Sequence, residues 1–97
     1  MAGKSESKAV RIRIRGRVQN VWFRAWTVEQ ASQRGLAGWV RNRMDGSVEA
    51  LFSGAPHVVD EMIALCWQGP RAARVEAIDE TLAEPPAEPG FVTLSTE

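Results

Sequence analysis

The stretch VRIRIRGRVQNVWFR, residues 10–24, decides the fold and points to the chemistry. Apolar and charged side chains alternate through residues 10–15, and this period of two is typical of a strand with one buried face. The apolar residues, expected to face the core, are Val10, Ile12 and Ile14. The charged residues, expected to face solvent, are Arg11, Arg13 and Arg15.

A helix is predicted soon after this strand. Gly16 ends the alternation and begins a loop through about Val21, and the helix runs from roughly Trp22 to Arg34. Gly35 suits the left-handed conformation that ends many helices. The stripe at helical spacing, expected to be buried, consists of Val21, Ala25, Val28 and Ser32, with Ala31 beside it.

Four further strands and a second helix are predicted in the rest of the chain. Strand-like runs cover residues 36–41 and the segment after the Asp45-Gly46 turn signal. The second helix has Pro56 near its first turn and ends at Gly69-Pro70. Its apolar stripe consists of Val59, Met62, Ile63 and Cys66. Strands at residues 74–80 and 91–95 flank a stiff segment that contains three prolines, Pro85, Pro86 and Pro89.

The predicted order is βαββαβ with a short final strand. Such a chain covers one face of an antiparallel sheet with its two helices. We therefore expect an α+β, ferredoxin-like sandwich. This fold says little about function, because many unrelated activities use it.

The composition fits one small domain. The 97 residues include 12 Lys plus Arg and 12 Asp plus Glu, so the formal net charge is zero. A protein that binds nucleic acid mainly through bulk charge would need a basic excess. The single Cys and the single His are too few for a zinc cluster and exclude an internal disulfide.

The first eight residues are small and polar, and they lack the apolar run of a signal peptide. No stretch approaches the roughly 20 apolar residues of a membrane span. We expect residues 1–8 to be a disordered lead and residues 9–97 to form one domain. Because a lone thiol suits a reducing compartment, we expect a soluble, cytoplasmic protein.

His57 and Cys66 are not placed to act as base and nucleophile. They are nine positions apart on the second predicted helix, so at about 100° per residue they point to opposite faces. Cys66 is expected to be a buried apolar side chain and His57 an exposed residue of the first turn. The carboxylates are scattered, and no acid–base pair stands out.

The segment from Gly16 to Arg24 is a candidate anion site. Backbone N–H groups can converge where a loop enters a helix, and the helix dipole is positive there. Arg24 falls in the first turn, where positive charge opposes the dipole, so a functional reason is worth considering. A guanidinium beside such amides could bind two phosphate oxygens. The alternative is an ordinary connection with a surface arginine, since the loop has neither glycine-rich phosphate fingerprint.

Asn42 is a second candidate. It lies at the end of a predicted strand, and its side-chain amide both donates and accepts hydrogen bonds, so it could position a water molecule. The alternative is that Asn42 caps the following turn, as asparagine often does.

Two spaced motifs run through these segments. Gly16, Val18, Gln19, Val21, Phe23 and Arg24 fit the pattern G-x-V-Q-G-V-x-F-R. Gly38, Trp39, Val40, Arg41, Asn42, Gly46, Val48 and Gly54 fit G-[aromatic]-V-[basic]-N-x-x-x-G-x-V-x-x-x-x-x-G. In order and separation, the two motifs resemble the signatures of the acylphosphatase family, and the resemblance covers nearly the whole chain.

The resemblance implies a ferredoxin-like hydrolase that cleaves the carboxyl–phosphate bond of acyl phosphates. It implies that Arg24 binds the phosphoryl group and that Asn42 orients the attacking water. The backbone amides that would complete the phosphate cradle are those of Val18, Gln19, Asn20, Val21, Trp22 and Phe23. No metal, no other cofactor and no covalent intermediate are implied. The expected ligands are a small acyl phosphate and, as product-like anions, inorganic phosphate or sulfate.

Asn20 departs from the family pattern, which has glycine at this position. Asparagine is the residue that best tolerates the left-handed region after glycine, so the cradle can still form. Its side chain could narrow the cradle. Trp22 falls at a variable position, where it could form a wall of the site or simply pack.

Two alternatives use the same fold. One is a non-catalytic anion-binding module; a similar domain also occurs inside larger hydrogenase-maturation proteins that handle carbamoyl phosphate. We count against it that the chain has no zinc-finger cysteines after this domain. The other is an RNA-binding sheet, which needs aromatic residues on its open face. The outward row is arginine instead, and we expect it to pair with acids such as Glu49 or Glu76. We therefore expect no nucleic-acid partner, and we expect no membrane partner either. Because small neutral domains of this kind are often monomeric, we also expect a monomer.

Overall fold

A computed structural model of the chain describes residues 6–97. The elements, in order, are β1 (Lys8–Arg17), α1 (Phe23–Gln33), β2 (Ala37–Asn42), β3 (Val48–Gly54), α2 (Pro56–Cys66), β4 (Arg74–Leu82) and β5 (Phe91–Thr93). This order confirms the prediction. Of the lead expected to be disordered, residues 1–5 lie outside the described part, whereas Lys8 belongs to β1 and pairs with Gly54.

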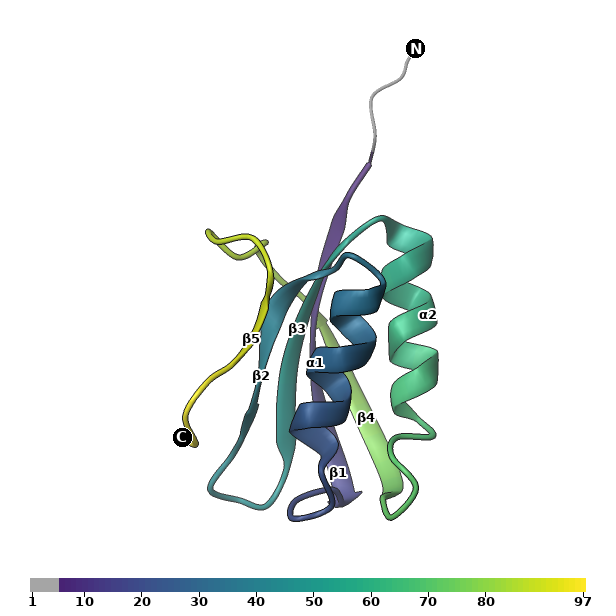
Figure 1. Cartoon of the computed structure of the whole chain (residues 1–97), viewed down its shortest axis with the longest axis vertical. Coiled ribbons are helices and arrows are strands. Elements are labelled where there is room, and N and C mark those ends of the chain that lie inside the picture. The colour runs from purple at the N-terminus through teal and green to yellow at the C-terminus, as the bar shows by residue number, and fades with distance from the viewer. Residues whose placement is uncertain (1–5) are drawn as a thin grey trace.

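The five strands form one sheet in the order β4-β1-β3-β2-β5. Both helices lie on one face, α1 against β2 and β5, and α2 against β3 and β1 (Figure 1). The pairs β1–β3, β1–β4 and β2–β3 are antiparallel. These features confirm the ferredoxin-like α+β fold.

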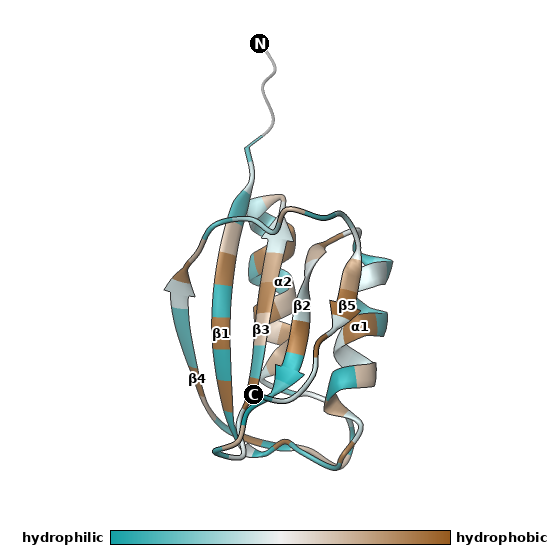
Figure 2. Cartoon of the chain, turned by 90° about the vertical axis from the view of Figure 1, so that its left-hand side faces the viewer, coloured by the Kyte–Doolittle hydropathy of each residue, from teal (hydrophilic) through white to brown (hydrophobic). Residues whose placement is uncertain are grey.

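The direction of β5 corrects one part of the prediction. β5 pairs with β2 in parallel, with Gly38 opposite Phe91 and Val40 opposite Thr93, so the sheet is mixed rather than wholly antiparallel. The reason is the route of the chain. β4 and β5 lie at opposite edges, and the segment between them crosses the end of the sheet before β5 runs back alongside β2 (Figure 2).

The apolar face of the sheet is covered by the helices. Figure 2 shows hydrophobic and hydrophilic residues alternating along β1. The predicted core residues of β1 and of α2 are all buried: Val10, Ile12, Ile14, Val59, Met62, Ile63 and Cys66. Within residues 6–97, neither helix is long and apolar enough to cross a membrane.

The predicted buried stripe of α1 is partly wrong. The buried residues of this helix are Phe23, Thr27 and Ala31, whereas Ala25 and Ser32 are exposed. The residue at which the helix begins sets its buried face: Phe23 enters the core, and every fourth residue follows it. Thr27 can be buried because its hydroxyl donates a 2.8 Å hydrogen bond to the carbonyl oxygen of Phe23.

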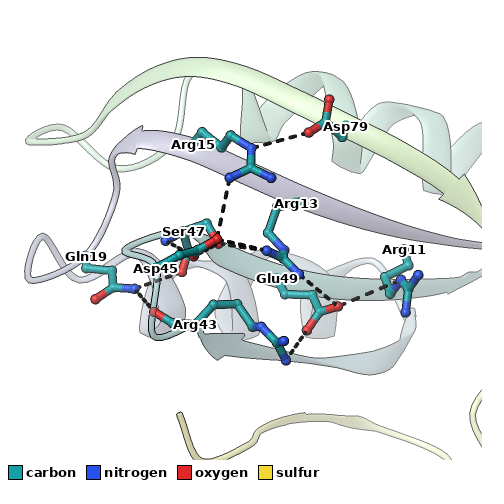
Figure 3. Close-up of polar contacts among 9 residues, drawn as sticks. All are labelled: Arg11, Arg13, Arg15, Gln19, Arg43, Asp45, Ser47, Glu49 and Asp79. Carbon is teal, nitrogen blue, oxygen red and sulfur yellow. Dashed lines mark hydrogen bonds and ion pairs between the residues drawn. The ribbon is translucent and has the colours of Figure 1, made fainter. Parts of the chain in front are cut away.

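The open face of the sheet carries a network of charged side chains (Figure 3). The buried carboxylate of Glu49 lies 3.8, 4.0 and 3.3 Å from guanidinium nitrogens of Arg11, Arg13 and Arg43. The prediction that the arginine row pairs with Glu49 is therefore confirmed.

The predicted pairing with Glu76 is wrong. The register between β1 and β4 shifts between Arg15 and Gly16, so that Glu76 falls at the irregularity and is exposed. Asp79 takes its place, with a carboxylate oxygen 3.4 Å from the Arg15 guanidinium. An irregularity of this kind re-aims the side chains beside it.

Candidate active site

The loop after β1 and the turn between β2 and β3 lie at the same end of the sheet (Figure 1). The side-chain amide of Gln19 joins them: Nε2 donates 2.8 Å hydrogen bonds to the carbonyl oxygens of both Arg43 and Ser47 (Figure 3). The two predicted segments of the site are thereby held together. Sequence reasoning assigned only the backbone amide of Gln19 to the site and missed this bracing role. The one signal for it was an amide side chain in the middle of a loop.

The loop backbone has the shape of an anion cradle. Asn20 and Trp22 have φ angles of 64° and 67°, in the left-handed region. Turn conformations of this kind let neighbouring N–H groups converge on one anion. The N–H groups of residues 18–22 donate no backbone hydrogen bond to another described residue. Asn20 thus adopts the left-handed conformation at the position where the family pattern has glycine, as expected from the tolerance of asparagine for this region. The N–H groups of the loop are free to donate to an anion.

The N-terminus of α1 begins in this cradle. Trp22 at the N-cap makes no side-chain capping hydrogen bond, and the first turn contains no acidic residue. The first N–H groups of any helix have no partner within it, and the helix dipole gives this end partial positive charge. An anion would satisfy both the donors and the dipole.

One cavity of about 560 Å³ brings most of the predicted site together. Arg24 and Asn42 both line it. The other lining residues are Val18, Asn20, Trp22, Phe23, Ala25 and Thr93. Of the predicted cradle, Gln19 and Val21 do not line the cavity: the Gln19 side chain braces the turn, and Val21 is buried. Thr93 was not predicted, since only the parallel pairing of β5 brings it here.

The guanidinium of Arg24 is not neutralised by a neighbouring acid. Among residues 6–97, no carboxylate lies within ion-pair distance of it. By contrast, Arg11, Arg13, Arg15 and Arg43 each lie within ion-pair distance of an acid. A positive side chain left without an acid beside uncapped amides is suited to a phosphate.

Asn42 lies at the end of β2, where it forms part of the wall of the cavity. The residue is buried, with 8% of its surface exposed. The alternative that it caps the turn is not supported, because Asp45 does so. Its carboxylate accepts hydrogen bonds from the hydroxyl and the N–H of Ser47, at 2.6 and 3.0 Å. These hydrogen bonds, with the charges of Arg13 and Arg15, lower the pKa of Asp45 to about 2.

Cys66 and His57 lie where the sequence predicted. Cys66 is buried, and burial raises the pKa of its thiol to about 12, which leaves it unreactive near neutral pH. His57 is exposed. Over residues 6–97, no group of three or more His, Cys, Asp or Glu side chains is placed to hold a metal ion.

Comparison with known proteins shows which family the chain belongs to. A family model described as acylphosphatase matches residues 10–93. A curated acylphosphatase of Rhizorhabdus wittichii is 58% identical over 78 residues, which cover 80% of this chain and 79% of the relative. One from Rhodospirillum rubrum is 52% identical over 84 residues, covering 87% and 92%. The crystal structure of acylphosphatase from Bacillus subtilis superposes with a TM-score of 0.83 at 33% identity, covering 89% of this chain and 97% of that one. The chain therefore belongs to the acylphosphatase family of hydrolases.

Proposed function

We propose that this acylphosphatase binds the phosphoryl group of its substrate through Arg24 and the backbone N–H groups of residues 18–23, and orients the attacking water through Asn42. One observation carries the proposal: a single cavity is lined by Arg24, by Asn42 and by a loop whose N–H groups have no backbone acceptor among residues 6–97. Water oxygen attacks phosphorus, the bond between phosphorus and the acyl oxygen breaks, and the carboxylate leaves with the electron pair. Both hydrogens of the water remain on oxygens of the inorganic phosphate, so the products are a carboxylate and dihydrogen phosphate.

Arg24 and the amides stabilise the charge of the transferring phosphoryl group. Phosphoryl transfer through a loose transition state needs positioning and electrostatic stabilisation more than covalent help. The guanidinium can hold two phosphate oxygens at once, and fixed backbone donors need no reorganisation during the reaction. Because a carboxylate leaves readily at neutral pH, no general acid is required.

Asn42 acts on the water. Its side-chain oxygen accepts a hydrogen bond from the water, which turns a lone pair toward phosphorus, and its NH₂ group can donate to a phosphate oxygen. Because amides do not titrate near neutrality, this role needs no shifted pKa.

The reaction proposed here uses neither a metal nor another cofactor, since Arg24 and the amides supply the positive charge. We propose further that the enzyme acts as a monomer in the cytoplasm, with inorganic phosphate as the product ligand. Sedimentation at several protein concentrations tests the monomer, and hydrolysis in the presence of a chelator tests metal independence.

The decisive experiment measures phosphate release from benzoyl phosphate, with chelator present. Arg24→Ala should lower kcat/KM by about 10²-fold or more, the usual cost of an oxyanion donor, and should weaken inhibition by inorganic phosphate. Arg24→Lys should recover only part of the loss, because an ammonium cannot make the bidentate contact. Arg71→Ala, at an exposed arginine outside the cavity, is the matched control.

Asn42→Ala separates binding from catalysis. It should lower kcat while inhibition by inorganic phosphate stays close to that of the wild type. Wild-type turnover in purified Asn42→Ala would remove the water-positioning role, and wild-type turnover in Arg24→Ala would overturn the proposed mechanism.

A further inference from the structure

Trp22 is unusual among the tryptophans of this chain. It is 82% exposed, although it lines the cavity that holds Arg24. Trp26, by comparison, packs against the core and edge-on to Phe23, with ring centroids 5.4 Å apart. Core packing therefore does not account for the position of Trp22.

The backbone at Trp22 adds to the anomaly. Its φ of 67° lies in the left-handed region, which is a genuine outlier for a bulky residue. Strained backbone persists where the surrounding structure enforces it, and such positions cluster at ligand sites. Here a large aromatic ring is held in solvent at the edge of a cavity, in a conformation that glycine would adopt more easily.

We propose that the indole of Trp22 is a contact surface for the acyl group of the substrate, so that the enzyme favours acyl phosphates with an aromatic or other large flat acyl group. This proposal rests on the proposed function, because it takes the phosphoryl group to be bound by Arg24 and the loop amides. Trp22 is the N-cap of the helix that carries Arg24. An acyl group joined to the bound phosphoryl group through one oxygen would emerge beside this ring.

The lining of the cavity also supports separate contacts for the phosphoryl group and for the acyl group. Its polar members, Asn20, Arg24, Asn42 and Thr93, suit the phosphate and the water. Its apolar members, Val18, Trp22, Phe23 and Ala25, suit the rest of the substrate. Of these four, Val18 and Phe23 are buried, so Trp22 offers the large exposed apolar surface. Binding sites commonly combine a few convergent polar groups with an apolar or aromatic wall.

The test is a selectivity ratio: kcat/KM for benzoyl phosphate divided by kcat/KM for acetyl phosphate. Differences in intrinsic reactivity between the two substrates cancel when this ratio is compared among variants. Trp22→Asn removes the ring and keeps a residue that tolerates positive φ. The ratio should fall about 3- to 10-fold, which is the range that aromatic stacking supplies.

Trp22→Phe should restore the ratio to within about 3-fold of the wild type, because the ring is kept. Trp67→Asn is the matched control, since Trp67 is also an exposed tryptophan but does not line the cavity. It should leave the ratio unchanged. A wild-type ratio in Trp22→Asn would overturn the proposal, even if both rates fell together.

Arg24→Ala, measured on the same two substrates, separates this proposal from the proposed function. It should lower both values of kcat/KM by a similar factor. If Arg24→Ala is inactive and Trp22→Asn keeps the ratio, the acyl contact is wrong and the phosphate site stands. If Arg24→Ala is as active as the wild type, the proposed function fails, and the acyl contact fails with it.

Discussion

Replacing Gln19 by leucine tests whether the loop and the turn must be braced. The change keeps a side chain of similar size and removes both hydrogen bonds, 2.8 Å each, to the carbonyl oxygens of Arg43 and Ser47. Each contributes about 1 kcal/mol net. Both carbonyls keep a second donor, because the Gly46 N–H bonds the oxygen of Arg43 and the Arg43 N–H bonds that of Ser47. The expected loss is therefore about 2 kcal/mol, without the larger penalty of a stranded buried group.

For a domain of this size, such a loss lowers Tm by roughly 8–16 °C. Thermal unfolding followed by circular dichroism measures it, with Gln33→Leu as the matched control, because Gln33 is exposed at the end of α1. Hydrolysis and inhibition by inorganic phosphate should weaken in Gln19→Leu as well, because the cradle and Asn42 are no longer held at one spacing.

A Tm for Gln19→Leu within about 2 °C of the control would refute the energetic argument. A lower Tm with unchanged kcat and unchanged phosphate inhibition would refute the positioning argument alone. In that case the brace would stabilise the fold without setting the geometry of the site.

Three further predictions follow from single residues. Because the folded pKa of Asp45 is about 2, below its ordinary 3.8, its stabilisation is complete above pH 3.8 and is lost as the pH falls toward 2. In urea titrations over this range, Asp45→Asn should therefore lose less stability than the wild type, and equal losses would contradict this. Gly38 has a φ of 143°, and a Cβ there would overlap the carbonyl oxygen of Leu51, so Gly38→Ala should abolish folded protein by circular dichroism. Gly46→Ala, where a Cβ meets open space, should fold with a smaller loss of Tm. His57→Ala should leave both kcat/KM and its pH dependence as in the wild type, because His57 is exposed and does not line the cavity, and a change in either would show that His57 takes part.

Local signals were enough to predict most of the fold. The alternation in residues 10–15 and the Asp45-Gly46 turn depend on neighbouring residues, and both appear in the structure as predicted. The direction of β5 depends on the route of the chain across the sheet, and the buried face of α1 depends on Phe23 being its first residue. Neither can be obtained from periodicity alone.

In the site, too, some features could be predicted from local sequence and others depend on tertiary structure. Arg24 and Asn42 belong to motifs whose spacing is written in the chain, so they could be named together before the structure brought them to one cavity. The two hydrogen bonds of Gln19 depend on where a distant turn lies, and Thr93 depends on strand pairing. Such contacts are made by tertiary structure and leave little trace in sequence.

The parallel docking of β5 has a consequence for how the enzyme is assembled. Thr93 makes one wall of the cavity, and the pairing of Gly38 with Phe91 joins residues 53 positions apart. Closing the intervening loop costs entropy, and the three residue pairs between β2 and β5 offer little to repay it, so we expect β5 to dock after the longer strands have paired. A chain that has folded its hairpin but not docked β5 lacks part of its site. Recovered hydrolysis is therefore a stricter measure of refolding than far-ultraviolet circular dichroism, to which a strand of three residues contributes little.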